Sequence, residues 1–188
     1  MTIILDNGHG SETSGKRSPV WRDGSQLFEY EFNRDIVRRI SNKLNKLGIK
    51  NIILVPELED ISLSERCKRA NNIYNKDKNC LLISIHANAG GGTGWEAWTS
   101  VGQTKADDYA TELYKTAERH FPEWKIRTDY SDGDPDKESQ FYILKNTKMP
   151  AILTENFFMD TEKDCRFIMS EEGRERIANM HVDFISRL

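Results

Sequence analysis

Residues 81–87 read LLISIHA, a near-continuous apolar run that contains a histidine close to its end. Such a run is typical of a strand that is buried on both faces, as strands are in parallel sheets covered by helices. Residues 151–156, AILTEN, show the same pattern and contain a glutamate near their end. The two runs therefore predict a parallel sheet that lies between layers of helices.

Strand-like and helical patterns alternate along the 188 residues of the chain. This alternation predicts one domain over residues 1–188 with a three-layer α/β/α fold, in which helices flank a mostly parallel central sheet of about six strands. The expected strands are Ile3–Asp6, Asn51–Pro56, Cys80–His86, Trp95–Ser100, Gln140–Leu144 and Ala151–Glu155. The expected helices cover about Leu27–Leu47, Leu63–Asn75, Lys105–His120 and Glu171–Leu188.

Composition excludes several classes of protein. A net charge of −3 argues against a general nucleic-acid binder, which would usually be basic. No apolar stretch approaches the roughly 18 residues of a membrane span.

The N-terminus lacks a basic segment followed by a long apolar run, so no signal peptide is visible. Cys67, Cys80 and Cys165 are isolated from one another, which indicates reduced cytosolic thiols and not a disulfide framework.

Three expected strand ends contain chemically active side chains, in the motifs DNGHG, SIHAN and LTENF. In parallel α/β sheets, ligands bind beyond the carboxyl ends of the strands. We therefore expect His9, His86 and Glu155 to lie at the edge of the sheet where a site belongs. A plain turn needs only Asn-Gly or Asp-Gly, so the histidine between Gly8 and Gly10 is not required to turn the chain.

The first expected helix has an acid on its apolar face. Five apolar residues recur at helical spacing and span about 120° of the helical wheel at about 100° per residue; they are Phe32, Ile36, Ile40, Leu44 and Leu47. On this wheel Glu29 falls within the apolar stripe and Glu31 faces water, while Asn33 faces inward one turn after Glu29. An unpaired buried carboxylate costs several kcal/mol, more than the roughly 1.5–3 kcal/mol gained by burying one large apolar side chain. Glu29 should therefore have a metal or a base as its partner, unless it lies in a frayed, solvated first turn.

Two histidines and one glutamate from separate elements would make a catalytic zinc site. Zinc accepts imidazole nitrogen and carboxylate oxygen, and a catalytic site keeps a fourth position for water. A further carboxylate, Glu155, could take the proton of that water and deliver it to a leaving amine. Ligand type alone leaves manganese and cobalt open as alternatives to zinc.

Four blocks in this order resemble the zinc-dependent N-acetylmuramoyl-L-alanine amidases of the type 3 family: ILDNGHGS, FEYEFN, ISIHANA and PAILTENFFMD. The stretch ISLSERCKRAN resembles the family's Leu-x-x-Arg-x-x-x-Asn helix, and the similarity covers about residues 2–187. The chain departs from the family pattern at Asn7, Tyr30, Phe157 and Asp160. At these positions the family usually has a proline or alanine, a lysine, a glycine and an asparagine, respectively.

The resemblance implies that His9, Glu29 and His86 hold one Zn²⁺ per chain and that Glu155 is the catalytic acid and base. It implies an amide substrate in peptidoglycan, cut between the lactyl group of N-acetylmuramic acid and L-alanine. The helical wheel and the family pattern select Glu29 independently. Two enzymes of other specificity, a zinc peptidase and an amidohydrolase for small molecules, stay open, as does a non-catalytic module that binds the cell wall.

Several further residues have two interpretations. Asp6 and Asn33 could orient the ligands or make ordinary polar contacts, and Asn88 could meet the substrate or cap a loop. The acidic stretch DYSDGDPDKES, residues 129–139, is spaced like the start of a calcium loop but lacks the later glutamate of an EF-hand. We interpret it as a solvated loop. His181 lies on the apolar side of the last helix, where a packed histidine is expected.

The same features give expectations about partners and location. We expect a monomer whose partner is peptidoglycan, with no nucleic acid and no membrane insertion. The chain would be made in the cytoplasm and act on the cell wall or periplasm. Without a visible signal peptide, it would be released as a phage or prophage endolysin through a partner pore, or it would be a bacterial enzyme whose leader has been removed.

Overall fold

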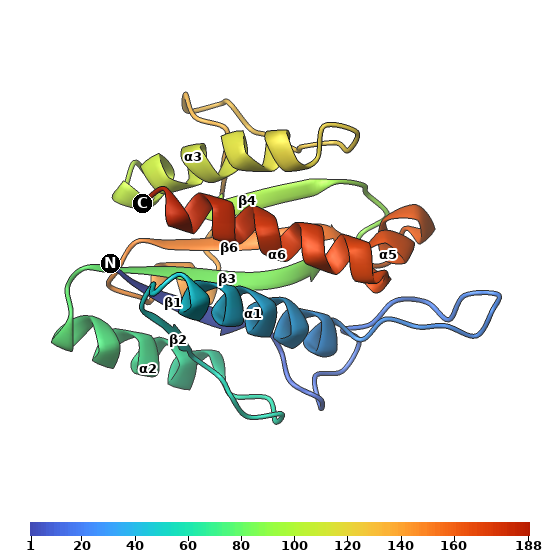
Figure 1. The fold of residues 1–188 in the computed structure, drawn as a ribbon, viewed down its shortest axis with the longest axis horizontal. Coiled ribbons are helices and arrows are strands. Elements are labelled where there is room, and N and C mark those ends of the chain that lie inside the picture. The colour runs from blue at the N-terminus through green and yellow to red at the C-terminus, as the bar shows by residue number, and fades with distance from the viewer.

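The computed structural model describes all 188 residues, which form six strands and six helices (Figure 1). The strands are β1 (Thr2–Asn7), β2 (Asn51–Ile53), β3 (Cys80–Asn88), β4 (Trp95–Thr99), β5 (Lys137–Glu138) and β6 (Ala151–Phe158). The helices are α1 (Glu29–Lys46), α2 (Leu63–Lys76), α3 (Lys105–His120), α4 (Tyr142–Lys145), α5 (Glu162–Met169) and α6 (Glu171–Ser186).

One sheet contains all six strands in the order β2-β1-β3-β6-β4-β5. The strands β2, β1, β3 and β6 run parallel, β4 is antiparallel to β6, and β5 is parallel to β4. This confirms the predicted mostly parallel sheet of an α/β domain. In the ladder between β3 and β6, His86 is the direct partner of Glu155. The register thus places two candidate site residues next to each other on adjacent strands.

Helices cover both faces of the sheet. Figure 1 shows α1, α6 and α3 side by side across one face, and contacts between these helices confirm the arrangement. They enclose the larger core, while α2 and α4 cover the opposite face over a smaller core. Consecutive strand residues alternate between the cores: Leu82 belongs to the smaller one, and Leu81 and Ile83 to the larger one. This is why the central strands are apolar at nearly every position.

The expectation for residues 140–144 is wrong. The stretch was expected to be a strand, but Tyr142–Lys145 is the short helix α4, and the edge strand β5 lies earlier in the chain. The helical turn buries Ile143 and Leu144 in the smaller core and leaves Phe141 and Tyr142 partly exposed beside them. The helix α5 was not expected at all. The other helices begin and end within three residues of their expected bounds.

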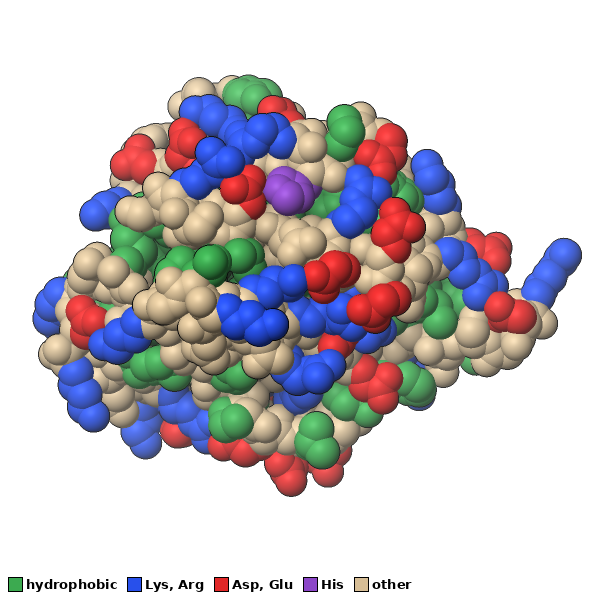
Figure 2. All heavy atoms as spheres, viewed as in Figure 1, with side chains coloured by type: hydrophobic (Ala, Val, Ile, Leu, Met, Phe, Trp, Pro, Cys, Tyr) green, Lys and Arg blue, Asp and Glu red, His purple; other side chains and the backbone are tan.

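Acidic and basic side chains are interspersed on the face formed by α1, α6 and α3 (Figure 2). Ion pairs link the helices there, for example from Arg39 on α1 to Glu171 on α6 at 2.5 Å. No helix is both long enough and apolar enough to cross a membrane. Cys67, Cys80 and Cys165 are buried free thiols, in agreement with the expected absence of a disulfide framework.

Candidate metal centre

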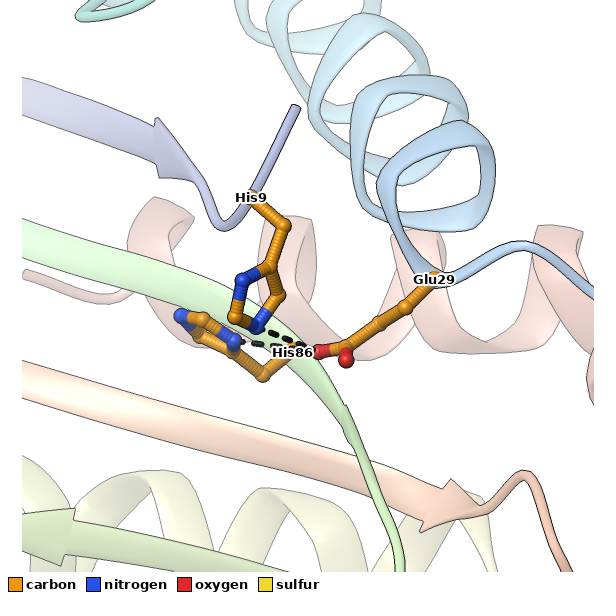
Figure 3. A group of neighbouring side chains, drawn as sticks. All are labelled: His9, Glu29 and His86. Atoms are coloured by element: carbon orange, nitrogen blue, oxygen red, sulfur yellow. Dashed lines mark hydrogen bonds and ion pairs between the residues drawn. The ribbon is translucent and has the colours of Figure 1, made fainter. Parts of the chain in front are cut away.

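Three side chains converge at the edge of the sheet formed by the carboxyl ends of β1 and β3. His9 comes from the loop after β1, His86 from the end of β3 and Glu29 from the first turn of α1 (Figure 3). The Oε1 atom of Glu29 lies 3.4 Å from Nε2 of His9 and 3.1 Å from Nδ1 of His86. One ligand atom from each residue lies within 4.8 Å of the others. The structure therefore brings together the three residues predicted as ligands.

The backbone around His9 has little space for side chains. His9 has a φ of 65°, in the left-handed region that residues other than glycine rarely adopt. A Cβ atom added at Gly8 would lie 2.0 Å from Cε1 of His86, and one added at Gly10 would lie 2.3 Å from the backbone nitrogen of Asp60. Both glycines are thus explained by close approach, Gly8 to the second imidazole and Gly10 to a neighbouring loop.

Side chains from two helices hold this strained loop by its carbonyl groups. Asn33 donates a hydrogen bond from Nδ2 to the Gly8 carbonyl at 3.0 Å. The His9 carbonyl accepts from Nη1 of Arg34 at 2.9 Å and from Nη2 of Arg66 at 3.1 Å. A strained backbone conformation persists only where contacts with the rest of the protein hold it in place. The hydrogen bonds from these three side chains hold the loop around His9 in this way.

The buried ion pair between Asp6 and Arg66 lies directly beneath this loop. Nη1 of Arg66 donates to Oδ1 of Asp6 at 2.8 Å and to the Asn7 carbonyl at 2.9 Å. The other oxygen of Asp6 accepts from the Ser84 hydroxyl at 2.6 Å. Asp6 therefore touches the guanidinium that holds the loop and makes no hydrogen bond or ion pair with the candidate ligand side chains. The polar contacts of Asp6 are fully satisfied.

Glu29 is buried, and the two imidazoles beside it favour its ionised form. It is 1% exposed, which rules out the solvated first turn. Burial alone would raise the pKa of Glu29, but the hydrogen bonds and charges of His86 and His9 outweigh it and hold that pKa well below its usual range. The same contact raises the pKa of His86 against the opposing effect of burial. Exposed Glu31, two residues later, faces solvent as the helical wheel predicts.

The donor set and its spacing fit a tetrahedral zinc ion. Ligand atoms at 2.0–2.1 Å from such an ion lie about 3.3–3.4 Å apart, close to the distances from Glu29 to the two imidazoles. The second oxygen of Glu29, Oε2, is buried without any hydrogen-bond donor. A buried carboxylate with few donors is costly, and a cation held by Oε1 and the two imidazoles would compensate its charge.

Glu155 lies beside this group, on the neighbouring strand β6. Its Oε2 atom is buried without a hydrogen-bond donor. Burial raises the pKa of Glu155 to about 8, against the smaller opposing effect of the charge of His86. On the next strand, Glu96 is the cross-strand partner of Glu155, but Arg127 and Lys137 lie within 2.6 and 2.9 Å of its carboxylate. Of these two adjacent carboxyl groups, only Glu155 lacks a cationic partner.

A cavity of about 400 Å³ opens over His9, His86 and Glu155. Its polar lining includes Thr13, Lys16 and Asp60. Its apolar lining comes mainly from the start of α2 and from α4, and it includes Ile61, Leu63, Phe141, Tyr142 and Ile143. Pockets of this size with a few convergent polar groups are typical of small-ligand and catalytic sites.

The remaining predicted residues have mixed outcomes. Asn88 does not line the cavity, because its Nδ2 atom donates to Glu96 at 2.8 Å and its Oδ1 atom accepts from the next backbone amide. His181 is a packed core histidine, as expected.

Sequence reasoning missed Arg34 and Arg66 as residues that position the site. Arg66 could have been found by the helical-wheel argument that selected Glu29. It falls in the apolar series Leu63, Cys67, Ala70 at spacings of three and four residues, and it is 2% exposed. Arg34 gives no such signal, because its side chain reaches the His9 carbonyl from a partly exposed position.

The six-stranded α/β fold matches that of solved amidase catalytic domains. The model of the N-acetylmuramoyl-L-alanine amidase family matches residues 3–187, and the chain belongs to this family. The solved N-acetylmuramoyl-L-alanine amidase from Clostridium difficile 630 superposes with a TM-score of 0.84 at 27% identity, over 99% of this chain and 95% of that one.

Two sequence relatives extend beyond the length of this chain. The amidase CwlM of Bacillus licheniformis is 29% identical over 194 residues, a match that covers all of this chain and 68% of CwlM. The endolysin of Bacillus phage SPP1 is 27% identical over 193 residues, which is 99% of this chain and 65% of the endolysin. The chain spans about two thirds of the length of both relatives. It is an enzyme of the N-acetylmuramoyl-L-alanine amidase class.

Proposed function

We propose that residues 1–188 act as one catalytic domain that cuts peptidoglycan with the help of zinc, at the amide between the lactyl group of N-acetylmuramic acid and L-alanine. In this proposal His9, Glu29 and His86 hold one Zn²⁺, and Glu155 is the acid and base. The observation that supports it best is the convergence of two imidazoles and one ionised carboxylate beside Glu155 in a single cavity.

A zinc ion, when bound, supplies a Lewis acid that polarises a carbonyl and makes water more acidic. The chain's own residues do the rest. In its ionised form, Glu155 removes a proton from the attacking water. It then returns this proton to the nitrogen of the alanine, so that the carbon–nitrogen bond breaks and the alanine leaves as a neutral amine. Its buried position keeps competing donors away from its carboxylate. Apolar side chains at α4 line the cavity in which the scissile amide would lie.

The relatives also bear on where the protein acts. They include enzymes named as cell-wall amidases and a phage endolysin. We propose that this chain likewise acts on the cell wall, as a monomer that does not insert into the membrane. Release by a phage or prophage pore and export with a leader remain the two routes to be distinguished.

Elemental analysis of bound metal, with peptidoglycan hydrolysis measured in parallel, tests the ligand set. We expect about one zinc per chain in the wild type, lost in His9→Ala and Glu29→Ala. Glu31→Ala is the matched control, since this neighbouring glutamate is exposed, and it should keep both metal and activity. Full metal in Glu29→Ala would disprove the ligand set. If the wild type binds manganese or cobalt in preference to zinc, the proposed identity of the metal is wrong.

Two further measurements test the reaction. Glu155→Gln should keep its zinc and lose a factor of roughly 10²–10⁴ in rate, the usual contribution of general acid–base catalysis. Product analysis should show intact stem peptides with a new amino group on L-alanine. Cleavage elsewhere in the peptide would indicate a zinc peptidase, and a folded, zinc-loaded protein that binds walls without cutting them would indicate a binding module.

A further inference from the structure

The acidic loop 129–136 differs from the solvated loop expected from its sequence. It connects the segment after α3 to the edge strand β5 and lies on the outer side of the molecule next to α3 (Figure 1). Asp132 is exposed, as expected. Asp136, however, is only 2% exposed, and Asp134 is partly buried. At the end of the loop, one carboxyl group is therefore buried and a second is partly buried.

Each of these two carboxyl groups has one oxygen with a donor and one without. Oδ2 of Asp136 accepts from the Thr99 hydroxyl at 2.7 Å, and Oδ2 of Asp134 accepts from Nε2 of Gln103 at 3.3 Å. The Oδ1 atoms of both residues are buried and have no hydrogen-bond partner. The side chains lie within hydrogen-bonding reach of each other, and burial together with Asp134 raises the pKa of Asp136 to about 8.

No basic side chain neutralises this pair. Neither aspartate has an ion-pair partner, nor does Asp107, the acid of α3 whose charge acts on Asp136. The nearest lysine in sequence is Lys137, but its Nζ atom lies 2.9 Å from the carboxylate of Glu96 on β4. Two adjacent buried carboxyl groups without a basic partner must either share a proton or bind a cation.

We propose that Asp134 and Asp136 bind a divalent cation of the calcium class, in a site separate from the His9–Glu29–His86 group. The ligand atoms at this place are the carboxylate oxygens and the Thr99 hydroxyl, all of them hard oxygen ligands. Zinc is disfavoured, because no nitrogen or sulfur ligand is present. The two unpartnered Oδ1 atoms, one of them on a side chain that is almost fully buried, are the observation that points to a ligand.

The site would stabilise the edge of the sheet next to the cavity. Asp136 immediately precedes β5, a strand of only two residues that pairs with the end of β4. Thr99, the donor to Asp136, is the last residue of β4. A cation here would therefore fix the loop to both strands, six residues before α4 begins at Tyr142, one of the residues that line the cavity.

Thermal unfolding of the zinc-loaded full chain, with and without millimolar calcium, tests the proposal. Chelators are omitted, because they would also remove zinc from the other site. For a dissociation constant of about 10⁻⁴–10⁻³ M, we expect 1 mM calcium to raise Tm by about 1–6 °C. Asp134→Asn and Asp136→Asn should lose this rise. Asp108→Asn, the same change at an exposed aspartate of α3, should keep it.

Terbium luminescence gives a readout that does not depend on the stability of the variants. Tyr130 lies in the same loop and can sensitise terbium bound there. Emission from the zinc-loaded wild type should reach a plateau at one ion per chain and be displaced by calcium. An unchanged Tm together with no emission would overturn the proposal, and the pair would then share a proton. A calcium effect that persists in both aspartate variants would also overturn it.

Discussion

Gly8 is explained by its close approach to the imidazole of His86. Its backbone does not lie in the left-handed region, so alanine could adopt the same conformation. Yet an alanine Cβ would lie 2.0–2.5 Å from three atoms of the His86 ring. We predict that Gly8→Ala displaces this ring, abolishes zinc binding and lowers the free energy of unfolding by about 1–3 kcal/mol. Metal analysis and chemical denaturation would measure both effects.

A double-mutant cycle supplies the control for this prediction. In a His86→Ala background the ring is absent, and the added methyl group has no atom to collide with. Gly8→Ala should then change the free energy of unfolding by less than about 0.5 kcal/mol. An equal loss of stability in both backgrounds would show that the glycine is required for its backbone and not for the approach of the imidazole.

The residues of the site differ in how far sequence could predict them. Glu29 was predictable, because an acid in an apolar helical stripe needs a partner. The left-handed conformations of His9 and Phe157 were not, since no periodicity reports the sign of φ. Phe157 stands where the family usually has glycine, and its φ of 67° explains that preference. Here the strain is offset by packing, because the ring lies in an aromatic cluster with Phe121, Trp124 and Phe167.

At the scale of elements, α1 both supplies a candidate ligand and holds the loop of another. Glu29 and Asn33 lie one helical turn apart, so the face that presents the carboxylate also presents the amide that bonds the Gly8 carbonyl. We predict that Asn33→Leu weakens zinc affinity by about 10–100-fold, the usual effect of removing a group that orients a ligand. Competition with a chromophoric chelator would measure this affinity.

The matched control is Asn42→Leu, the same substitution at an exposed position of α1. Asn33→Leu should also lower the free energy of unfolding by about 1–3 kcal/mol, because it leaves the Gly8 carbonyl without a donor. We expect Asn42→Leu to bind zinc as tightly as the wild type. If Asn33→Leu is destabilised but also binds zinc as tightly as the wild type, the contact made by Asn33 is purely structural.

The elements themselves were predictable in proportion to their length and periodicity. The strands β1, β3 and β6 were recognised because burial on both faces makes them apolar throughout. The stretch around Ile143 was misassigned, since a short apolar run flanked by aromatic residues fits a strand and a buried helical turn equally well. What decides between them is the smaller core, which accepts Ile143 and Leu144 from one turn of helix. That packing partner lies far away in sequence, on α2 and β3.

At the scale of the whole molecule, strand β6 contributes both to the packed core and to the candidate site. One face of β6 packs on α6 through His181, while Glu155 on the opposite side of the chain lines the cavity. His181 is fully buried, its Nδ1 atom lies 2.8 Å from the Ile177 carbonyl, and its Nε2 atom lies 3.2 Å from the Thr154 hydroxyl. These contacts fit a neutral imidazole that donates from Nδ1 and accepts at Nε2.

Burial lowers the pKa of His181 to about 4, whereas the unfolded chain should show the ordinary value of about 6.5. Below pH 6.5 the unfolded state therefore binds more protons than the folded state. The stability contributed by the neutral histidine is complete above this pH and is lost as the pH falls from about 6.5 to about 4. Between pH 7 and pH 5 the loss should amount to about 2 kcal/mol.

Denaturant unfolding of wild type and His181→Asn across this pH range would measure the effect. Asparagine keeps a donor for the Ile177 carbonyl but has no group that titrates near neutral pH. The variant should be less stable than wild type at pH 7, and the gap should narrow by about 2 kcal/mol at pH 5, because only wild type pays the protonation penalty. His120→Asn, the same change at a partly exposed histidine, should leave that slope in place. Parallel curves for wild type and His181→Asn would mean that the acid sensitivity of the fold comes from its ion-paired carboxylates alone.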